Sequence, residues 1–186
     1  MKTFKKLSVL FITLFFVFGT AQINAQHKYV GVKKCSMCHK SAKRGAQYKI
    51  WKNSAHAHAF KTLQTKEADA IAKKAGFKTK AAETPKCLKC HVTAYGVDSK
   101  LLDRKFKPEM GVQCESCHGA GKDYAKMNIM KSTSKSVAKG LIIYDHDNAK
   151  IKAMCVTCHN SENPTDKGFD FEKSWAKIKH YVPKKK

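Results

Sequence analysis

Four copies of one five-residue pattern constrain this chain more than any other feature. The pattern is Cys-x-x-Cys-His, and its copies begin at Cys35, Cys87, Cys114 and Cys155. In this pattern the two thiols form thioethers to a porphyrin edge, and the histidine becomes an axial ligand of the iron. All eight cysteines fall in these copies. The sequence therefore predicts four covalently bound haem c groups, each with its iron.

The residues of the four motifs have two predicted roles. The predicted thioether positions are Cys35, Cys38, Cys87, Cys90, Cys114, Cys117, Cys155 and Cys158. The predicted proximal iron ligands are His39, His91, His118 and His159. Only 22 residues separate the second motif from the third, so we expect the second and third haems to lie close together.

Other uses of paired cysteines explain the pattern less well. Two zinc sites with four thiolates each, or a set of disulfides, would not require a histidine after every second cysteine. A thioredoxin-type redox motif would occur once, in a βαβ setting that this sequence lacks. The chain has 9 histidines in 186 residues, and chance does not place one after all four pairs.

The first 25 residues have the layout of a signal peptide. Three lysines precede a twelve-residue apolar run, 7–18, and small residues follow it up to Ala25. The run is shorter than the ~20 residues of a spanning helix. We expect cleavage after Ala25, with Ala21 as the alternative site and retention as a short anchor as the alternative fate. The predicted location is the periplasm, since bacteria attach haem to this motif outside the cytoplasmic membrane.

Residues 26–186 are then expected to form a single tetrahaem cytochrome c domain. A chain of 161 residues suffices for one domain but must accommodate four haems. The predicted fold class is mainly α, a multihaem cytochrome c in which the haems form the core and long irregular segments connect the helices. Such a chain should not fold without its cofactor, because the remaining side chains cannot build an adequate core.

The charge of the chain indicates what it binds. The formal net charge is +23, and the first 25 residues carry three of the 37 Lys and Arg and no acid, which leaves +20. Eight ionised haem propionates would lower this value. Electrostatic steering toward an acidic redox protein is the predicted use of the charge, with an anionic membrane surface as the alternative. Nucleic acid is not a predicted partner, since the chain has no recognition motif for it.

Local patterns predict several helices and almost no strand. Ser54 and Asp147 are suitable N-caps, and residues 66–75 have high helix propensity. An apolar stripe with helical spacing begins at Phe171. Residues 141–144 are the one strand candidate.

A second imidazole on an iron gives a low-spin electron carrier, whereas an empty sixth position leaves room for a small molecule. The histidines outside the four motifs are His27, His56, His58, His146 and His180. On a helix His56 shares a stripe with Phe60 and Leu63, whereas His58 points about 200 degrees away. We therefore predict His56 as an iron ligand and His58 as a surface residue.

The other three histidines are less constrained by the pattern. His146 can turn inward as a ligand or remain on the surface. His180 lies opposite the stripe that contains Trp175, so it reaches an iron only if the helix unwinds before Pro183 or if that face also meets a haem. His27 is two residues from the predicted new N-terminus and is expected to be disordered.

Two segments carry a resemblance to a known family. The sequence Gly-Val-Gln-Cys-Glu-Ser-Cys-His-Gly-Ala-Gly at 111–121 resembles the third haem motif of the cytochrome c-554 and c-prime family. The sequence Trp-Lys-Asn-Ser-Ala-His-Ala-His-Ala at 51–59 resembles the same family. The resemblance covers nearly all of the chain after residue 25 and includes the four motifs in order, with shorter connecting segments. It implies a mostly helical, exported tetrahaem electron carrier with closely packed haem pairs.

The resemblance also implies roles for single residues. It makes His56 the distal ligand of a haem other than its neighbour in sequence, makes His180 a ligand, and leaves the second haem without a sixth ligand. Many relatives carry a histidine soon after the third motif, where this chain has Lys-Asp-Tyr-Ala at 122–125. Either His146 fills that role, or one more iron is left with Tyr124, Met127 or nothing.

The predicted function is electron transfer between redox partners through closely spaced haems. Three haems would have two histidines each, supplied by His56, His146 and His180, and one haem would be open to small ligands. The alternative is a nitrogen-oxide or hydroxylamine-linked oxidoreductase that acts at the open haem. Tyr95 and Arg104 follow the second motif and are the nearest candidates in sequence for the distal donors that such an enzyme needs.

Overall fold

The structure is a computed structural model and describes residues 27–183. The signal peptide predicted for residues 1–25 lies outside the described residues. The α-helices are α1 (Val32–His39), α2 (Gln47–Lys52), α3 (Ala55–Thr62), α4 (Lys66–Lys74), α5 (Pro85–His91), α6 (Glu115–His118), α7 (Met127–Met130), α8 (Thr133–Val137), α9 (Asn148–Cys155) and α10 (Phe171–Ile178). The prediction of a mainly α fold is confirmed.

Short 3₁₀ turns and long irregular segments connect these helices. The 3₁₀ turns are η1 (Ala42–Arg44), η2 (Ala81–Glu83), η3 (Ser99–Leu101) and η4 (Pro108–Met110). Residues 27–183 contain no β-strand, and the one isolated bridge in this part of the chain joins Tyr29 to Leu102. None of the helices in these residues is long and apolar enough to cross a membrane.

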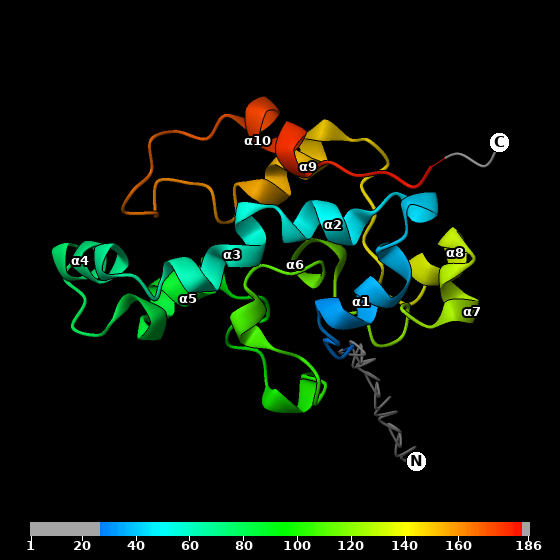
Figure 1. Ribbon diagram of the computed structural model, residues 1–186, viewed down its shortest axis with the longest axis horizontal. Helices are drawn as coiled ribbons and strands as arrows, with labels where there is room; N and C mark the ends of the chain where they lie inside the picture. The colour runs from blue at the N-terminus through cyan, green and yellow to red at the C-terminus, as the bar shows by residue number, and fades with distance from the viewer. Residues whose placement is uncertain (1–26, 184–186) are drawn as a thin grey trace, which may run out of the picture.

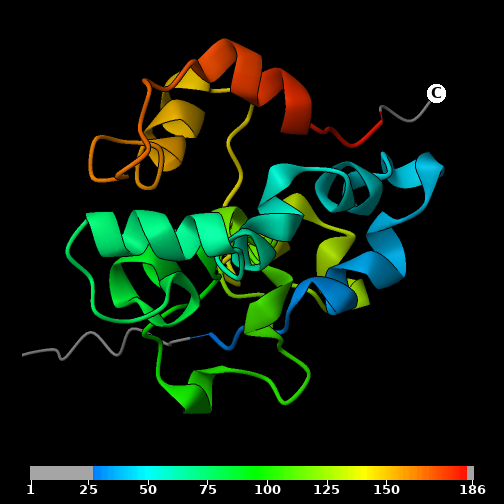
Figure 2. The same cartoon turned by 60° about the vertical axis from the view of Figure 1, so that its left-hand side comes forward.

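The helices are arranged around a central pair. In Figure 1, α2 and α3 run across the middle of the molecule, with α4 and α5 at one end and α1, α7 and α8 at the other. The helices α9 and α10 lie above this pair in the same view, and Figure 2 also shows them as a separate upper layer. The third motif, on α6, lies below α2 and α3 (Figure 1).

Three predicted helix starts and one predicted helix are confirmed. Ser54 is the N-cap residue of α3, although its hydroxyl donates to the carbonyl of Trp51 rather than accepting an amide. Asp147 caps α9 by accepting the amides of residues 149 and 150, and α10 begins at Phe171. The predicted helix over 66–75 is α4, and Thr65 caps it by accepting an amide.

The strand prediction for residues 141–144 is wrong. The segment is extended but pairs with a helix end instead of a strand, because the amide of Ile142 donates to the carbonyl of His118 at 3.0 Å. Its apolar residues instead line the third motif. The apolar run 141–144 thus lies beside a motif instead of forming a sheet.

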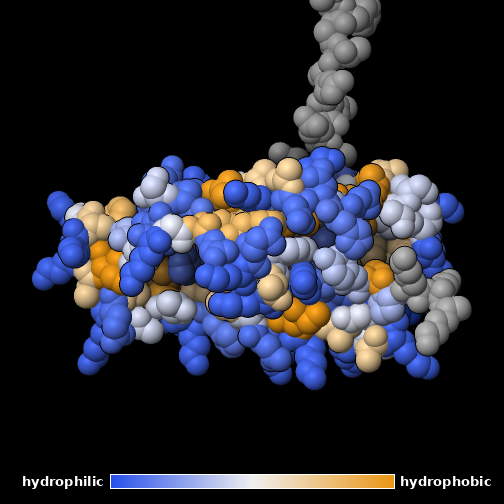
Figure 3. All heavy atoms as spheres, turned by 90° about the horizontal axis from the view of Figure 1, so that it is seen from above, coloured by the Kyte–Doolittle hydropathy of each residue, from blue (hydrophilic) through white to orange (hydrophobic). Residues whose placement is uncertain are grey.

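The apolar core is small for a chain of this length. The buried apolar residues within 27–183 are Val30, Val32, Leu63, Ala68, Ala72, Ala81, Val92, Phe106, Tyr124, Ile151 and Phe171. Only one contiguous buried cluster forms among these residues, with members just after α3 and on α4 and η2, and Cys87 and Leu88 of α5 pack against it. The face shown in Figure 3 is largely covered by hydrophilic residues.

Candidate haem-attachment sites

Each Cys-x-x-Cys-His motif lies at the end of a helix. The first two motifs occupy the C-terminal turns of α1 and α5, and the third forms α6 with Cys114 as its N-cap residue. The fourth begins at Cys155, the last residue of α9. A helical turn places two residues three apart on neighbouring positions of one face, which lets both thiols reach the same porphyrin edge.

Three of the four motif histidines have one ring nitrogen already engaged. The Nδ1 atom of His91 lies 2.7 Å from the carbonyl oxygen of Ala59, and that of His118 lies 2.9 Å from the carbonyl oxygen of Ile142. The Nδ1 atom of His39 lies 3.2 Å from Oε1 of Gln47. An acceptor at Nδ1 fixes the tautomer and orientation of the ring and leaves Nε2 unprotonated for a metal.

The third motif faces His180 across a cavity. The ring centroids of His118 and His180 are 5.9 Å apart. A cavity of about 80 Å³ between them is lined by both rings and by Cys114 and Cys117 of the same motif. Burial lowers the pKa of His118, which favours the neutral imidazole that iron requires. His180 also has its Nδ1 atom engaged, 2.9 Å from the carbonyl oxygen of Ile178.

The end of α10 brings His180 to this position. The helix stops at Ile178, and residue 179 has extended backbone angles (φ −57°, ψ 138°). The sequence pattern assigned His180 to the wrong face of a helix that would continue toward Pro183. Because α10 has already ended at Ile178, the face of the helix does not determine where the His180 side chain points.

The fourth motif faces His56 in the same way. The ring centroids of His56 and His159 are 6.0 Å apart. A cavity of about 370 Å³ is lined by both rings, by Cys155 and by Trp175 of α10. Burial lowers the pKa of both His56 and His159. Phe169 stacks on the ring of His159 with 4.7 Å between centroids.

These two separations fit an iron between the rings. Two metal–imidazole bonds of about 2 Å, together with the distance from each nitrogen to its ring centre, place the centroids of two axial histidines roughly 6 Å apart. Both pairs match this value. Each pair also borders a cavity lined by at least one cysteine of its own motif, so the residues present fit a covalently attached haem.

The remaining histidines are placed differently. His58 is exposed on α3, whereas His56 is not. His146 is exposed at a backbone φ of 62°, and its ring lies on Tyr181 with 4.6 Å between centroids. Within residues 27–183 the ring of His146 contacts no motif histidine. His27 was expected to be disordered; instead its Nδ1 atom lies 2.7 Å from Oδ2 of Asp123.

The thiols of the third motif lie near those of the first and the fourth. The Cys35 and Cys114 thiols are close enough to shift each other, which raises the pKa of Cys35 and lowers that of Cys114. Burial, with smaller effects from Cys155 and other neighbouring thiols, raises the pKa of Cys117 to about 11.

The second motif joins this group at two points. The hydroxyls of Thr93, two residues after the motif, and Ser116, inside the third motif, are 2.6 Å apart. Burial raises the pKa of Cys90 to about 11, with a further contribution from neighbouring Cys158. The second motif thus borders both the third and the fourth, whereas the spacing of the second and third haems themselves stays a prediction.

A buried carboxylate clamps the first motif to the third. Glu115, a spacer residue of the third motif, is 2 % exposed. Its two oxygens accept the amides of Val30, Gly31 and Gly121 at 2.7–2.8 Å. Burial raises the pKa of Glu115, and the three amide donors oppose that rise. The buried side chain of Gln113 accepts the next amide, that of residue 32.

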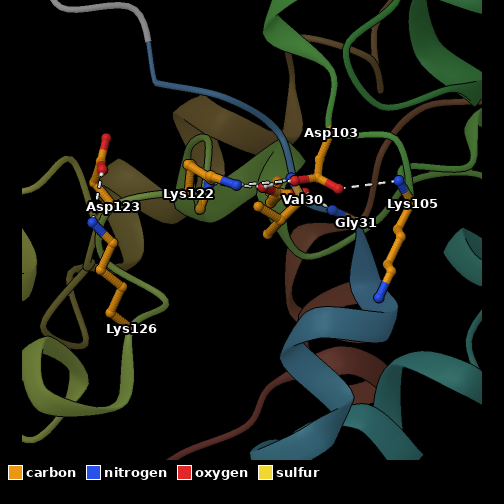
Figure 4. Close-up of polar contacts among 9 residues, drawn as sticks. Val30, Gly31, Asp103, Lys105, Lys122, Asp123 and Lys126 are labelled. Carbon is orange, nitrogen blue, oxygen red and sulfur yellow. Dashed lines mark hydrogen bonds and ion pairs between the residues drawn. The ribbon is translucent and has the colours of Figure 1, made fainter.

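The clamp acts at the point where the chain enters α1 (Figure 4). The first amides of a helix lack partners within the helix, and an acidic acceptor there is favourable. Gly31 has a φ of +80° and would place a Cβ 3.3 Å from the Phe106 backbone, so the entry needs glycine. An ion pair between Lys122 and Asp103 at 3.1 Å lies beside it (Figure 4).

Sequence reasoning missed the residues that support the motifs. Neither Glu115 and Gln113 nor the carbonyl groups that orient His91 and His118 were identified. A signal was present for two of them, since a Gln and a Glu lie within a glycine-flanked motif at 111–121. The carbonyl acceptors have no sequence signal, because any residue type supplies one.

No disulfide joins any two of the eight cysteines, all of which lie within residues 27–183. The side chains of residues 27–183 include no group of three or more His, Cys, Asp or Glu residues that could hold a metal ion by themselves. A haem iron needs only one or two imidazoles from the protein, since the porphyrin supplies its other ligands.

Comparison with known proteins agrees with this geometry. A model of the family described as cytochrome c554 and c-prime matches residues 34–119. The chain is 33% identical over 166 residues to cytochrome c-554 of Nitrosomonas europaea, and the match covers 83% of this chain and 68% of that protein. No solved structure matches the chain significantly. The chain therefore belongs to the cytochrome c554 and c-prime family, as an electron-carrying c-type cytochrome with covalently bound haem c.

Proposed function

We propose that the chain is an exported electron carrier with four haems, two of which have two histidine ligands each. The observation that carries this proposal is the pair of ring separations, 5.9 Å for His118 and His180 and 6.0 Å for His56 and His159. Each pair joins a motif histidine to one from a distant segment. Bound haem supplies an iron that alternates between the ferric and ferrous states.

The protein sets the spacing of the haem-attachment motifs and supplies the axial ligands of the irons. The third motif borders the first through Cys35, the second through Thr93 and the fourth through Cys155. Thioether positions this close would hold the four haems near one another, and the haem irons would supply one-electron chemistry there. Burial and axial ligands set the potentials of the irons.

The sixth position divides the four haems into two classes. We assign His180 to the third haem and His56 to the fourth, since their rings lie 5.9 Å and 6.0 Å from those of His118 and His159. The ring of His146 lies on Tyr181, so we do not propose His146 as an iron ligand. Of the three distal ligands predicted from the sequence, His56 and His180 remain. The first haem, on His39, and the second, on His91, then lack a distal histidine, and the open sixth position proposed for the second haem rests on the family resemblance.

We also propose that the protein is exported and that its redox partner is acidic. The signal peptide layout of residues 1–25 supports release into the periplasm. The +20 charge of the remaining chain supports association with an acidic redox protein. Such association should weaken as salt screens the charges.

Low-temperature paramagnetic resonance on the ferric holoprotein tests the assignment of axial ligands. We expect low-spin signals from the third and fourth haems and a high-spin signal from the second. Carbon monoxide added to the ferrous protein should change the visible spectrum, because an open iron binds it. Four low-spin irons and no response to carbon monoxide would contradict the open position, and a spectrum without low-spin signals would contradict the histidine pairs.

A further inference from the structure

The outer side of α1 combines an exposed apolar residue with uncompensated positive charge. Met37 is 67% exposed, although it lies between the two cysteines of the first motif. Lys33, Lys34 and Lys40 are also exposed. Residues three and four apart share one face of a helix, so these lysines surround Met37. We call these four residues the α1 basic face.

The opposite side of α1 faces the protein interior. Val32 is buried, and Cys35 and His39 are half-buried. The first haem is therefore expected on the inner side of the same helix, and a protein that contacts Met37 from outside is about one helix turn from the two thioether positions.

Acidic side chains do not neutralise this face. Residues 27–66 contain ten Lys and Arg and no Asp or Glu. The acids near the start of α1 are engaged elsewhere: buried Glu115 accepts backbone amides, Asp103 pairs with Lys122, and Asp123 pairs with Lys126 (Figure 4) and also with His27. None of the ion pairs within residues 27–183 includes a lysine of the α1 basic face.

No spacer residue of the other motifs is both apolar and as exposed as Met37. The spacer of the third motif contains Glu115, which is buried. At the second motif, Lys86 is paired with Glu162 at 2.8 Å, and the spacer residue Leu88 packs on the apolar cluster. At the fourth, Val156 is only 38% exposed.

We propose that an acidic redox protein docks on the α1 basic face and exchanges electrons with the first haem. The inference rests on the proposed function and adds the location of the contact. Lysines around the contact would steer the partner, and Met37 would form its desolvated centre, since protein interfaces combine an apolar core with a polar rim. In the reductive direction the partner loses one electron and the ferric iron of the first haem gains it, without bond formation or proton transfer.

Charge reversal on α1 tests the location. The probe is reduced plant-type ferredoxin, a small acidic protein that donates one electron from an iron–sulfur cluster. The variant is K33E/K34E/K40E, and the matched control is K66E/K78E/K80E. Both change the net charge by the same amount, and all six lysines are exposed. The control lysines lie on α4 and the loop after it, at the opposite end of the molecule from α1 (Figures 1 and 2).

Stopped-flow reduction at low ionic strength should separate the two variants. We expect the α1 variant to be reduced roughly tenfold more slowly than the parent, and the control to change much less. High salt should remove the difference, because it screens both surfaces. Equal slowing of the two variants, or no slowing of the α1 variant, would overturn the docking site. A different result would contradict the proposed function itself: a parent protein that lacks haem or does not accept electrons from dithionite.

Discussion

Replacing His56 with alanine is expected to convert the fourth haem from low spin to high spin. His56 is the imidazole opposite His159, with 6.0 Å between ring centroids, and other described side chains at that cavity offer no second imidazole. The variant should lose one low-spin signal in the ferric state and bind carbon monoxide at one more iron in the ferrous state. Both changes concern a whole haem and should approach one equivalent per protein.

His58→Ala is the matched control. It removes the same chemical group two residues away on the same helix, from an exposed position. We expect its spin state and carbon monoxide stoichiometry to equal those of the parent. If both variants behave alike, or if the His56 variant keeps all its low-spin signals, the assignment of His56 to the fourth haem is wrong.

Loss of the third motif is expected to destabilise the fold more than loss of the second. The variant C114S/C117S removes the attachment of the haem whose motif borders the other three. The variant C87S/C90S removes a haem beside the one apolar cluster, which includes Leu63 and Ala72. That region retains the contiguous cluster of buried apolar side chains, and the described residues form no second cluster of this kind. Cofactor binding and folding are coupled where no adequate core exists without the cofactor.

Far-UV circular dichroism during heating, together with the intact mass, measures both effects. We expect C87S/C90S to keep three haems and a cooperative unfolding transition. We expect C114S/C117S to lose cooperative unfolding and to accumulate poorly as a holoprotein. Similar thermal transitions for the two variants would show that the third haem is not the centre of the fold.

The parts of the fold that are predictable from sequence have local causes. Asp147 and Thr65 both cap helices through side-chain oxygens that accept nearby amides, and α4 has high intrinsic propensity. The four motifs are equally local, since the attachment chemistry needs five consecutive residues. His56 was preferred over His58 from helical periodicity, and the structure places only His56 beside a motif histidine.

The parts that the sequence pattern left open or missed depend on distant contacts. The pattern left open whether His180 reaches an iron, and its ring lies opposite His118 because α10 ends early, which no local signal marks before Pro183. The segment 141–144 is extended against the third motif instead of a strand. Glu115 binds amides that lie 84 and 85 residues away in the sequence. Pattern analysis finds attachment sites, whereas the pairing of these sites with distal ligands requires the tertiary structure.

The mass of the denatured holoprotein tests the central claim most directly. The protein should be produced with its full-length gene in a bacterial host that has the cytochrome maturation machinery, and then unfolded to release any haem held only by axial ligands. Thioether bonds survive this treatment, so we expect the polypeptide mass plus four haems. A colourless protein with the mass of the bare polypeptide, or a mass with fewer than four haems from a fully matured sample, would contradict the account.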